Sequence, residues 1–212
     1  MDQHLTFERH IKKVHKKMQG SVSLIKRSKR NLPKRIKLML YNSLVLSHVN
    51  YASAIWGSQS EHIKRLEITQ KRAIRAICLA PYNAHTKPLF SLTETLSLQH
   101  MIELNYLKLG SNIIQKREPK TICDIFPLKS KWGKTRSASI PLFQIPLCKR
   151  KSDARIPQFI IAKTWNTAVK YYGLDMLAKV HIMSKNYKEM RITEYKYFSC
   201  EIKKCYVCKK RA

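Results

Sequence analysis

Apolar residues recur every three or four positions in the first part of the chain, which is the spacing of one face of an α-helix. The first series predicts a helix with Thr6 as its N-cap, and it comprises Phe7, Ile11, Val14, Met18, Val22 and Ile25. Gly20 lies inside this pattern and costs a helix about 1 kcal/mol relative to alanine, which disfavours one unbroken helix. Pro33 suits the first turn of a second helix, whose apolar positions are Ile36, Leu40, Tyr41 and Leu44. Gly57 and Ser58 predict its end.

The clearest helical pattern runs from about His62 to Leu79, before Pro81. One side is apolar apart from a glutamine, with Ile63, Leu66, Gln70, Ala73, Ile74 and Ile77. The opposite side carries only Ile68 among its basic residues and no carboxylate, and those basic residues are Lys64, Arg65, Lys71, Arg72 and Arg75. A surface that only keeps a protein soluble usually mixes both signs of charge. The pattern therefore favours a helix that lies along a phosphate backbone, and the alternative is an ordinary solvated basic face.

A fourth helix is predicted from Leu98 to Lys116, closed by Glu118 and Pro119. Prolines then become frequent up to Pro157, which indicates a basic linker with possible short strands. Helix resumes near Gln158 and again from about residue 175. The expected fold class is mainly α: a basic helical bundle, a Pro-rich linker and a small, mostly helical C-terminal part. The expected segments are a helical domain over 1–126, the linker over 127–156, and a C-terminal helical segment with a cysteine-containing tail over 157–212.

Charge points to a polyanionic partner. The 212 residues contain 42 Lys and Arg against 13 Asp and Glu, a formal charge of +29. The basic residues occur in runs such as Lys26-Arg27 and Lys29-Arg30. Nucleic acid is the expected partner, because its phosphates bind Lys and Arg with release of counterions. An anionic membrane surface is less favoured, because the basic residues occur along the whole chain and not on one amphipathic stretch.

Composition also bears on the cellular compartment. Hydrophobic residues make up 44% of the chain, which is enough for a core and excludes a disordered basic tail. No apolar run approaches the roughly 20 residues of a membrane span, and the N-terminus has no apolar signal-peptide region. We therefore expect a nuclear or cytoplasmic protein that is neither secreted nor membrane-bound, with its six cysteines reduced.

No set of residues predicts a catalytic site. Nucleotidyl transfer needs closely placed carboxylates to hold two Mg²⁺ ions, but the aspartates are dispersed at Asp2, Asp124, Asp153 and Asp175. Five glycines without a cluster do not predict a phosphate loop. We therefore expect no enzymatic activity from this chain alone, and no bound cofactor.

The cysteine tail is the one candidate metal site. Cys200, Cys205 and Cys208 give the spacing C-x4-C-x2-C, and zinc commonly takes four Cys or His ligands. Only four residues follow Cys208 and none is a ligand, so a fourth would have to come from afar, as from His181. Three reduced thiols are the simpler interpretation, and we do not expect zinc.

Three blocks in a fixed order carry a resemblance to a known family: residues 40–44 (LYNSL), 48–57 (HVNYASAIWG) and 66–77 (LEITQKRAIRAI). Further marks in the same order are Leu5-Thr6-Phe7 with His10-Ile11, Ala84 to Phe90 as a short loop, Thr135-Arg136 and Trp165-Asn166. Together they resemble the region just after the catalytic palm in reverse transcriptases of non-LTR retrotransposons, the Jockey-like or LINE-type elements. The similarity covers residues 1 to about 170 and is best over 1–92. It fades late, since Thr167-Ala168-Val169 stands where the family has a Leu-Pro pair.

The resemblance implies the thumb and C-terminal region of an RNA-directed DNA polymerase, beginning where the palm would have ended. Its role would be to grip the template–primer, an RNA–DNA hybrid or other RNA or DNA duplex, through phosphates. The palm and fingers of a longer polymerase would be its partner, and Mg²⁺ is the metal of the full-length family. First contacts would be the five basic residues of the third helix, and a second group would be Lys131, Lys134 and Arg136.

Two aromatic residues of the second block, Tyr51 and Trp56, could stack on bases, although apolar members of such a motif are more often core. Two alternatives to the polymerase segment stay open. One is a co-opted, non-enzymatic nucleic-acid-binding protein, and the other is the product of a remnant open reading frame without function.

Overall fold

The computed structural model describes residues 7–28, 30–58, 60–129, 142–148, 156–172 and 178–196. The chain is mainly helical, as predicted. It forms two compact units, one made of residues 1–101 and 189–212 and the other of residues 102–188. The sequence predicted three segments that follow one another along the chain, whereas the first of these units combines the two ends of the chain. The boundaries of the three segments stay a prediction. None of the helices in the described ranges has both the length and the apolar character that crossing a bilayer requires.

Helix α1 (Glu8–Arg27) is a single unbroken helix. Five of the six predicted apolar positions are buried, namely Ile11, Val14, Met18, Val22 and Ile25. The predicted N-cap was wrong: Phe7 occupies that position in a left-handed conformation, without a side-chain hydrogen bond to the helix. Gly20 does not interrupt α1, and apart from the neighbouring residues and backbone of the same helix no atom lies within 4 Å of where its Cβ would stand.

A second helical stretch comprises α2 (Lys34–Tyr41), a π-helical segment η1 (Asn42–Leu46) and α3 (Ser47–Asn50). Its buried side is Lys37, Tyr41, Val45 and Val49. Of the predicted apolar positions, Tyr41 is buried as expected, whereas Leu40 and Leu44 are half-buried and Ile36 is 38% exposed. The positions of the buried side are four residues apart, and each such step overshoots an α-helical turn by about 40°. The wider π-turn offsets this drift and keeps the four side chains on one side.

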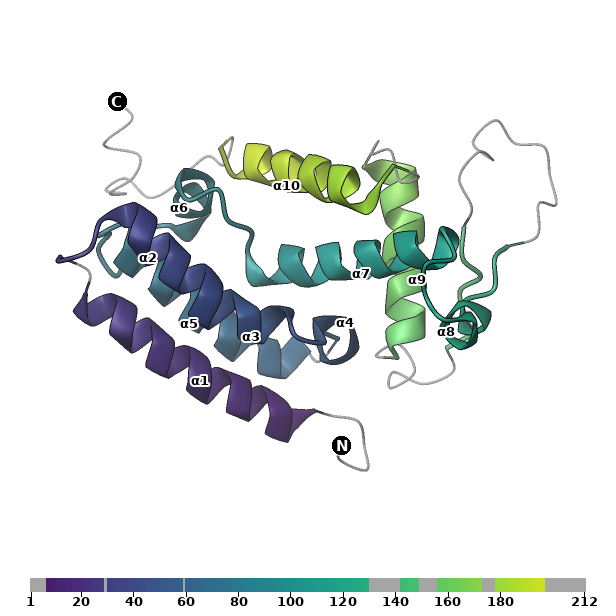
Figure 1. Cartoon of the computed structure of the whole chain (residues 1–212), viewed down its shortest axis with the longest axis horizontal. Helices are drawn as coiled ribbons and strands as arrows, with labels where there is room; N and C mark the ends of the chain where they lie inside the picture. Colours follow the sequence, from purple (N-terminus) through teal and green to yellow (C-terminus); the bar gives the residue numbers. More distant parts are fainter. Residues whose placement is uncertain are drawn as a thin grey trace. The chain divides into compact units, whose positions relative to one another are not determined.

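The second stretch ends at Asn50, before the predicted stop at Gly57. After Ala52, which is left-handed, a separate short helix, α4 (Ser53–Trp56), runs up to Gly57. Helix α5 (Ser60–Ile77) follows, and it packs beside α1 and α2 (Figure 1). Leu79 takes a left-handed conformation just beyond α5, and the Ala80 N–H donates to Arg75 O at 2.9 Å. This Schellman arrangement ends the helix before Pro81 is reached.

The segment expected to be a loop at Ala84 to Phe90 was predicted wrongly, because most of it is helical. It contains α6 (Thr86–Leu92), and Pro88 is tolerated there because it lies in the first turn, where N–H groups have no partner within the helix. Thr86, Leu89 and Phe90 are buried. Helix α6 packs against α5 within the same unit.

The second unit contains most of α7 (Leu98–Ile114), then α8 (Lys120–Ile125), α9 (Pro157–Tyr171) and the first part of α10 (Val180–Lys196). The possible strands of the linker reduce, in the described residues, to one antiparallel bridge between Leu128 and Phe143. The side-chain amide of Asn166 brackets the backbone of Phe143, accepting from its N–H at 3.0 Å and donating to its carbonyl at 2.9 Å. Glu103 accepts hydrogen bonds from the hydroxyls of Tyr172 and Tyr187.

Candidate nucleic-acid interface

Gln70 determines which side of α5 faces the interior. It is 1% exposed, and its Nε2 donates to Tyr41 Oη at 2.8 Å and to Leu96 O at 3.0 Å. Its Oε1 accepts from the Leu98 N–H at 2.8 Å. A buried polar group without a partner costs about 1–3 kcal/mol, so any other rotation of α5 is disfavoured. The predicted buried side is confirmed in full: Ile63, Leu66, Gln70, Ala73, Ile74 and Ile77 are all buried.

The opposite side of α5 carries what we call the cationic face: Lys64, Arg65, Lys71, Arg72 and Arg75. Lys64, Arg65 and Arg72 are exposed, and Lys71 and Arg75 are partly so. Ile68 lies among them and is 50% exposed. Within the described part of the chain, the first four of these cations form no ion pair. Their charges are therefore available to an anionic ligand.

A carboxylate at the edge of this face corrects one expectation. Glu67 was not counted in the sequence pattern, but it lines the same hollow as Lys71, on the side of α5 that faces α6 and the start of α7. Its Oε1 atom is buried and has no hydrogen-bond partner in the described residues. Lys71 therefore stands beside a negative group, and the purely positive part of the face is Lys64, Arg65, Arg72 and Arg75.

Arg75 is held in place from two directions. Its Nε donates to Ala84 O at 3.0 Å, and its guanidinium carbon lies 5.9 Å from the centroid of the Tyr82 ring, a cation–π contact. Burial lowers the pKa of the Arg75 guanidinium, and the nearby Tyr82 acts in the opposite direction. These contacts fix where the charge of Arg75 lies.

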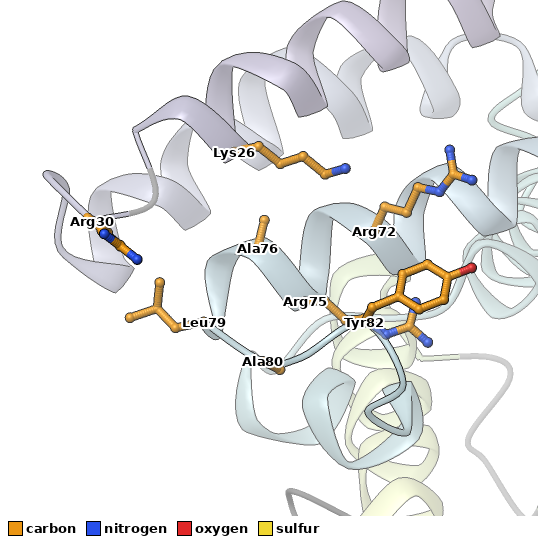
Figure 2. A pocket seen from close by; sticks show the side chains of 8 residues that line it. All are labelled: Lys26, Arg30, Arg72, Arg75, Ala76, Leu79, Ala80 and Tyr82. Carbon is orange, nitrogen blue, oxygen red and sulfur yellow. The ribbon is translucent and has the colours of Figure 1, made fainter.

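The ends of α1 and α5 enclose a hollow of about 500 Å³, which we call the cationic cavity. Figure 2 shows four basic side chains around it, Lys26 and Arg30 from α1 and the residues after it, and Arg72 and Arg75 from α5. The rest of the lining is Ala76, Leu79, Ala80 and Tyr82. None of the described residues that line it is acidic, so the cavity is suited to an anion.

The sequence did not predict this cavity. The basic runs that contain Lys26 and Arg30 were visible, but only the packing of α1 along α5 brings them to Arg72 and Arg75. Tyr82 follows Pro81 without any periodic pattern, so nothing in the sequence indicated its place beside Arg75. Three members of the site were therefore missed.

On its other flank the cationic face meets His15 of α1. The Thr69 hydroxyl donates to Arg65 O at 3.0 Å, so it accepts from His15 Nε2, which lies 3.0 Å away. Burial, and then the charges of Arg65 and Arg72, lower the pKa of His15. The pKa of His15 therefore depends on the positive charge of the cationic face.

The two aromatic candidates differ. Trp56 is 1% exposed, donates from Nε1 to Tyr51 O at 2.8 Å and has its ring 5.8 Å from that of His10, so it is a core residue. Tyr51 is 72% exposed. The core alternative for Trp56 is thereby confirmed, whereas Tyr51 lies on the surface.

Several expected site residues lie outside the described residues: Lys131, Lys134, Arg136, Cys200, Cys205 and Cys208. Over the ranges that the structure does describe, no three His, Cys, Asp or Glu side chains come together as metal ligands would. In comparisons with known proteins, no family model, curated protein or solved structure matches this chain. The function is therefore argued from the geometry of α1 and α5 and from the resemblance of the motifs.

Proposed function

We propose that the chain is the thumb and C-terminal region of a non-LTR retrotransposon reverse transcriptase and that it holds the template–primer duplex by its phosphates. The observation that carries this proposal is the row of cations on α5 that form no ion pair with the residues the structure describes. A duplex lying along Lys64, Arg65 and Arg72 would exchange condensed counterions for these side chains. The contacts would carry no sequence information, as suits a polymerase that copies any template.

Two further features support the proposal. The formal charge of +29 raises the local concentration of a polyanion before contact. The fixed rotation of α5, set by the hydrogen bonds of Gln70, keeps the cations on the outside without rearrangement. A helix face that is oriented in advance loses less conformational entropy on binding, which favours affinity.

The test is duplex binding by fluorescence anisotropy over a range of salt concentrations. The triple variant Lys64→Gln, Arg65→Gln and Arg72→Gln should bind more weakly, and its slope of log affinity against log salt should be shallower by roughly 2 to 3. A matched control removes the same charge from exposed lysines elsewhere: Lys120→Gln, Lys163→Gln and Lys188→Gln.

The control should keep most of the wild-type slope, because it changes the total charge but not the proposed contacts. Equal losses in the two triple variants would show that only total charge matters and would refute the interface on α5. A preference for one sequence that persists at high salt would refute the phosphate mode of binding.

A further inference from the structure

The cationic cavity differs from the rest of the cationic face because it combines charge with an exposed aromatic ring. Tyr82 is 82% exposed and Leu79 is 55% exposed, beside four basic side chains. Arg75 lies near the Tyr82 ring at 5.9 Å, and the high exposure of the ring leaves stacking surface open to solvent. A ligand that is only a phosphate would make no use of this apolar surface in binding, whereas a nucleobase can stack on it.

The size of the hollow agrees with a ligand of that kind. About 500 Å³ lies within the range of sites that enclose small organic molecules. Figure 2 shows Lys26 and Arg72 directed to the same side of the cavity, with Tyr82 beside Arg72 and Arg75, and Arg30 near Leu79 at the other end. The cavity thus offers charge for phosphates and a ring for a base within one site.

We infer that the cationic cavity holds an unpaired nucleotide of a single strand, with its base on Tyr82 and its phosphates among Lys26, Arg30 and Arg72. This inference rests on the proposed function and extends it, because a paired duplex keeps its bases stacked on one another and cannot offer one to Tyr82. The ligand is therefore a single-stranded segment of RNA or DNA, and the rest of the cationic face contacts paired backbone.

The test compares a short oligothymidine strand with a blunt-ended duplex of two strands, which has no unpaired loop, by anisotropy at one salt concentration. Tyr82→Ala should weaken binding of the strand by roughly 5- to 100-fold, which is the range for loss of one base–aromatic stack. Tyr82→Phe, which keeps the ring, should bind the strand as the wild type does, and Tyr82→Ala should leave binding of the blunt-ended duplex unchanged.

Tyr171→Ala is the matched control. Tyr171 is 67% exposed and has the amine of Lys170 at 4.8 Å from its ring centroid, but it does not line the cavity. This variant should bind both ligands normally. A loss of strand binding equal to that of Tyr82→Ala would overturn the inference, because the effect would then not depend on the position of the tyrosine in the cavity.

An abasic strand of the same length separates stacking from an effect on Arg75. Its binding should be insensitive to Tyr82→Ala, because the partner of the ring has been removed. An equal loss with normal and abasic strands would overturn the inference and leave a phosphate-only cavity. If the blunt-ended duplex binds and Tyr82→Ala does not affect the strand, the inference fails alone. If neither ligand binds, the proposed function fails with it.

Discussion

His15 of α1 and Thr69 of α5 are joined by a hydrogen bond of 3.0 Å between the ring Nε2 and the hydroxyl Oγ1. The bond lies beside Arg65 and Arg72, whose charges add to burial in lowering the pKa of the ring below 6.5. The unfolded chain therefore takes up a proton at His15 at a higher pH than the folded chain does. Protonation then opposes folding.

This relationship predicts how stability depends on pH. Above 6.5 the ring is neutral in both states and its contribution is fully present. As pH falls through 6.5 toward the lower folded pKa, the contribution should be lost, and below that pKa no more is lost. Urea-unfolding midpoints above and below 6.5 measure this. His15→Gln should lose less stability on acidification than the wild type, and equal losses would contradict the assignment.

Binding of nucleic acid should raise the pKa of His15. Phosphates near Arg65 and Arg72 would offset the positive charges that disfavour the imidazolium. The measurement is an NMR titration of the His15 ring with and without duplex. A titration curve that duplex does not move would place the phosphates away from this flank of α5.

The same substitution at two helical glycines should have opposite effects. A Cβ on Gly110 would lie 2.7 Å from Trp165 Cε3, and Trp165 is fully buried and cannot move aside. Gly110→Ala should lower the free energy of unfolding by about 1–3 kcal/mol. Gly20→Ala meets open space in the exposed part of α1 and should raise it by about 0.5–1 kcal/mol. Thermal melts of the two variants give the comparison, and a shift in the same direction would contradict the packing of α7 on α9.

The orientation of α5 can be tested with two isoleucines six residues apart. Ile74 is 0% exposed, and Ile74→Asp should destabilise the chain by about 4 kcal/mol or more, because an unpaired charge would be buried. Ile68 is 50% exposed, and Ile68→Asp should change the melting temperature little. Circular dichroism melts distinguish the two variants. A similar melting temperature in both would contradict the assignment of Ile74 to the buried side of α5 and of Ile68 to the exposed side.

Primer extension is expected to be absent from this chain by itself. The four aspartates are dispersed along the sequence, and two Mg²⁺ ions need closely placed acidic ligands. Purified protein should bind a template–primer yet incorporate no nucleotide with Mg²⁺ present. Incorporation above background, abolished by chelation, would contradict this expectation.

Periodicity predicted the buried sides of α1 and α5 because each side alternates with charged residues that can only face water. It failed at Ile36 of α2, which is exposed, while the neighbouring Lys37 is buried although an apolar pattern does not count a lysine. The loop expected at α6 came from the family resemblance and not from periodicity, and the helix found there buries Thr86, Leu89 and Phe90.

Part of the candidate site could likewise be predicted from the sequence, and part could not. The cations of α5 could be predicted because they share one helix and one period. The cationic cavity could not, because Lys26 and Tyr82 meet Arg72 only through the packing of α1 and the turn after α5. The carboxylate of Glu67 was missed because it lies at the margin of the face, where an idealised helix does not decide between inside and outside.

The three hydrogen bonds of Gln70 have a consequence for the order of folding. Their partners, Tyr41, Leu96 and Leu98, come from segments on both sides of α5 in the sequence. No local piece of the chain can complete the set, so the rotation of α5 is fixed only once these segments have packed together. Before that packing, the helix carries all of its positive charges, but the side on which they lie is not fixed. The sequence of α5 alone thus provides the electrostatic attraction, whereas the folded unit is needed to orient these charges toward a nucleic acid.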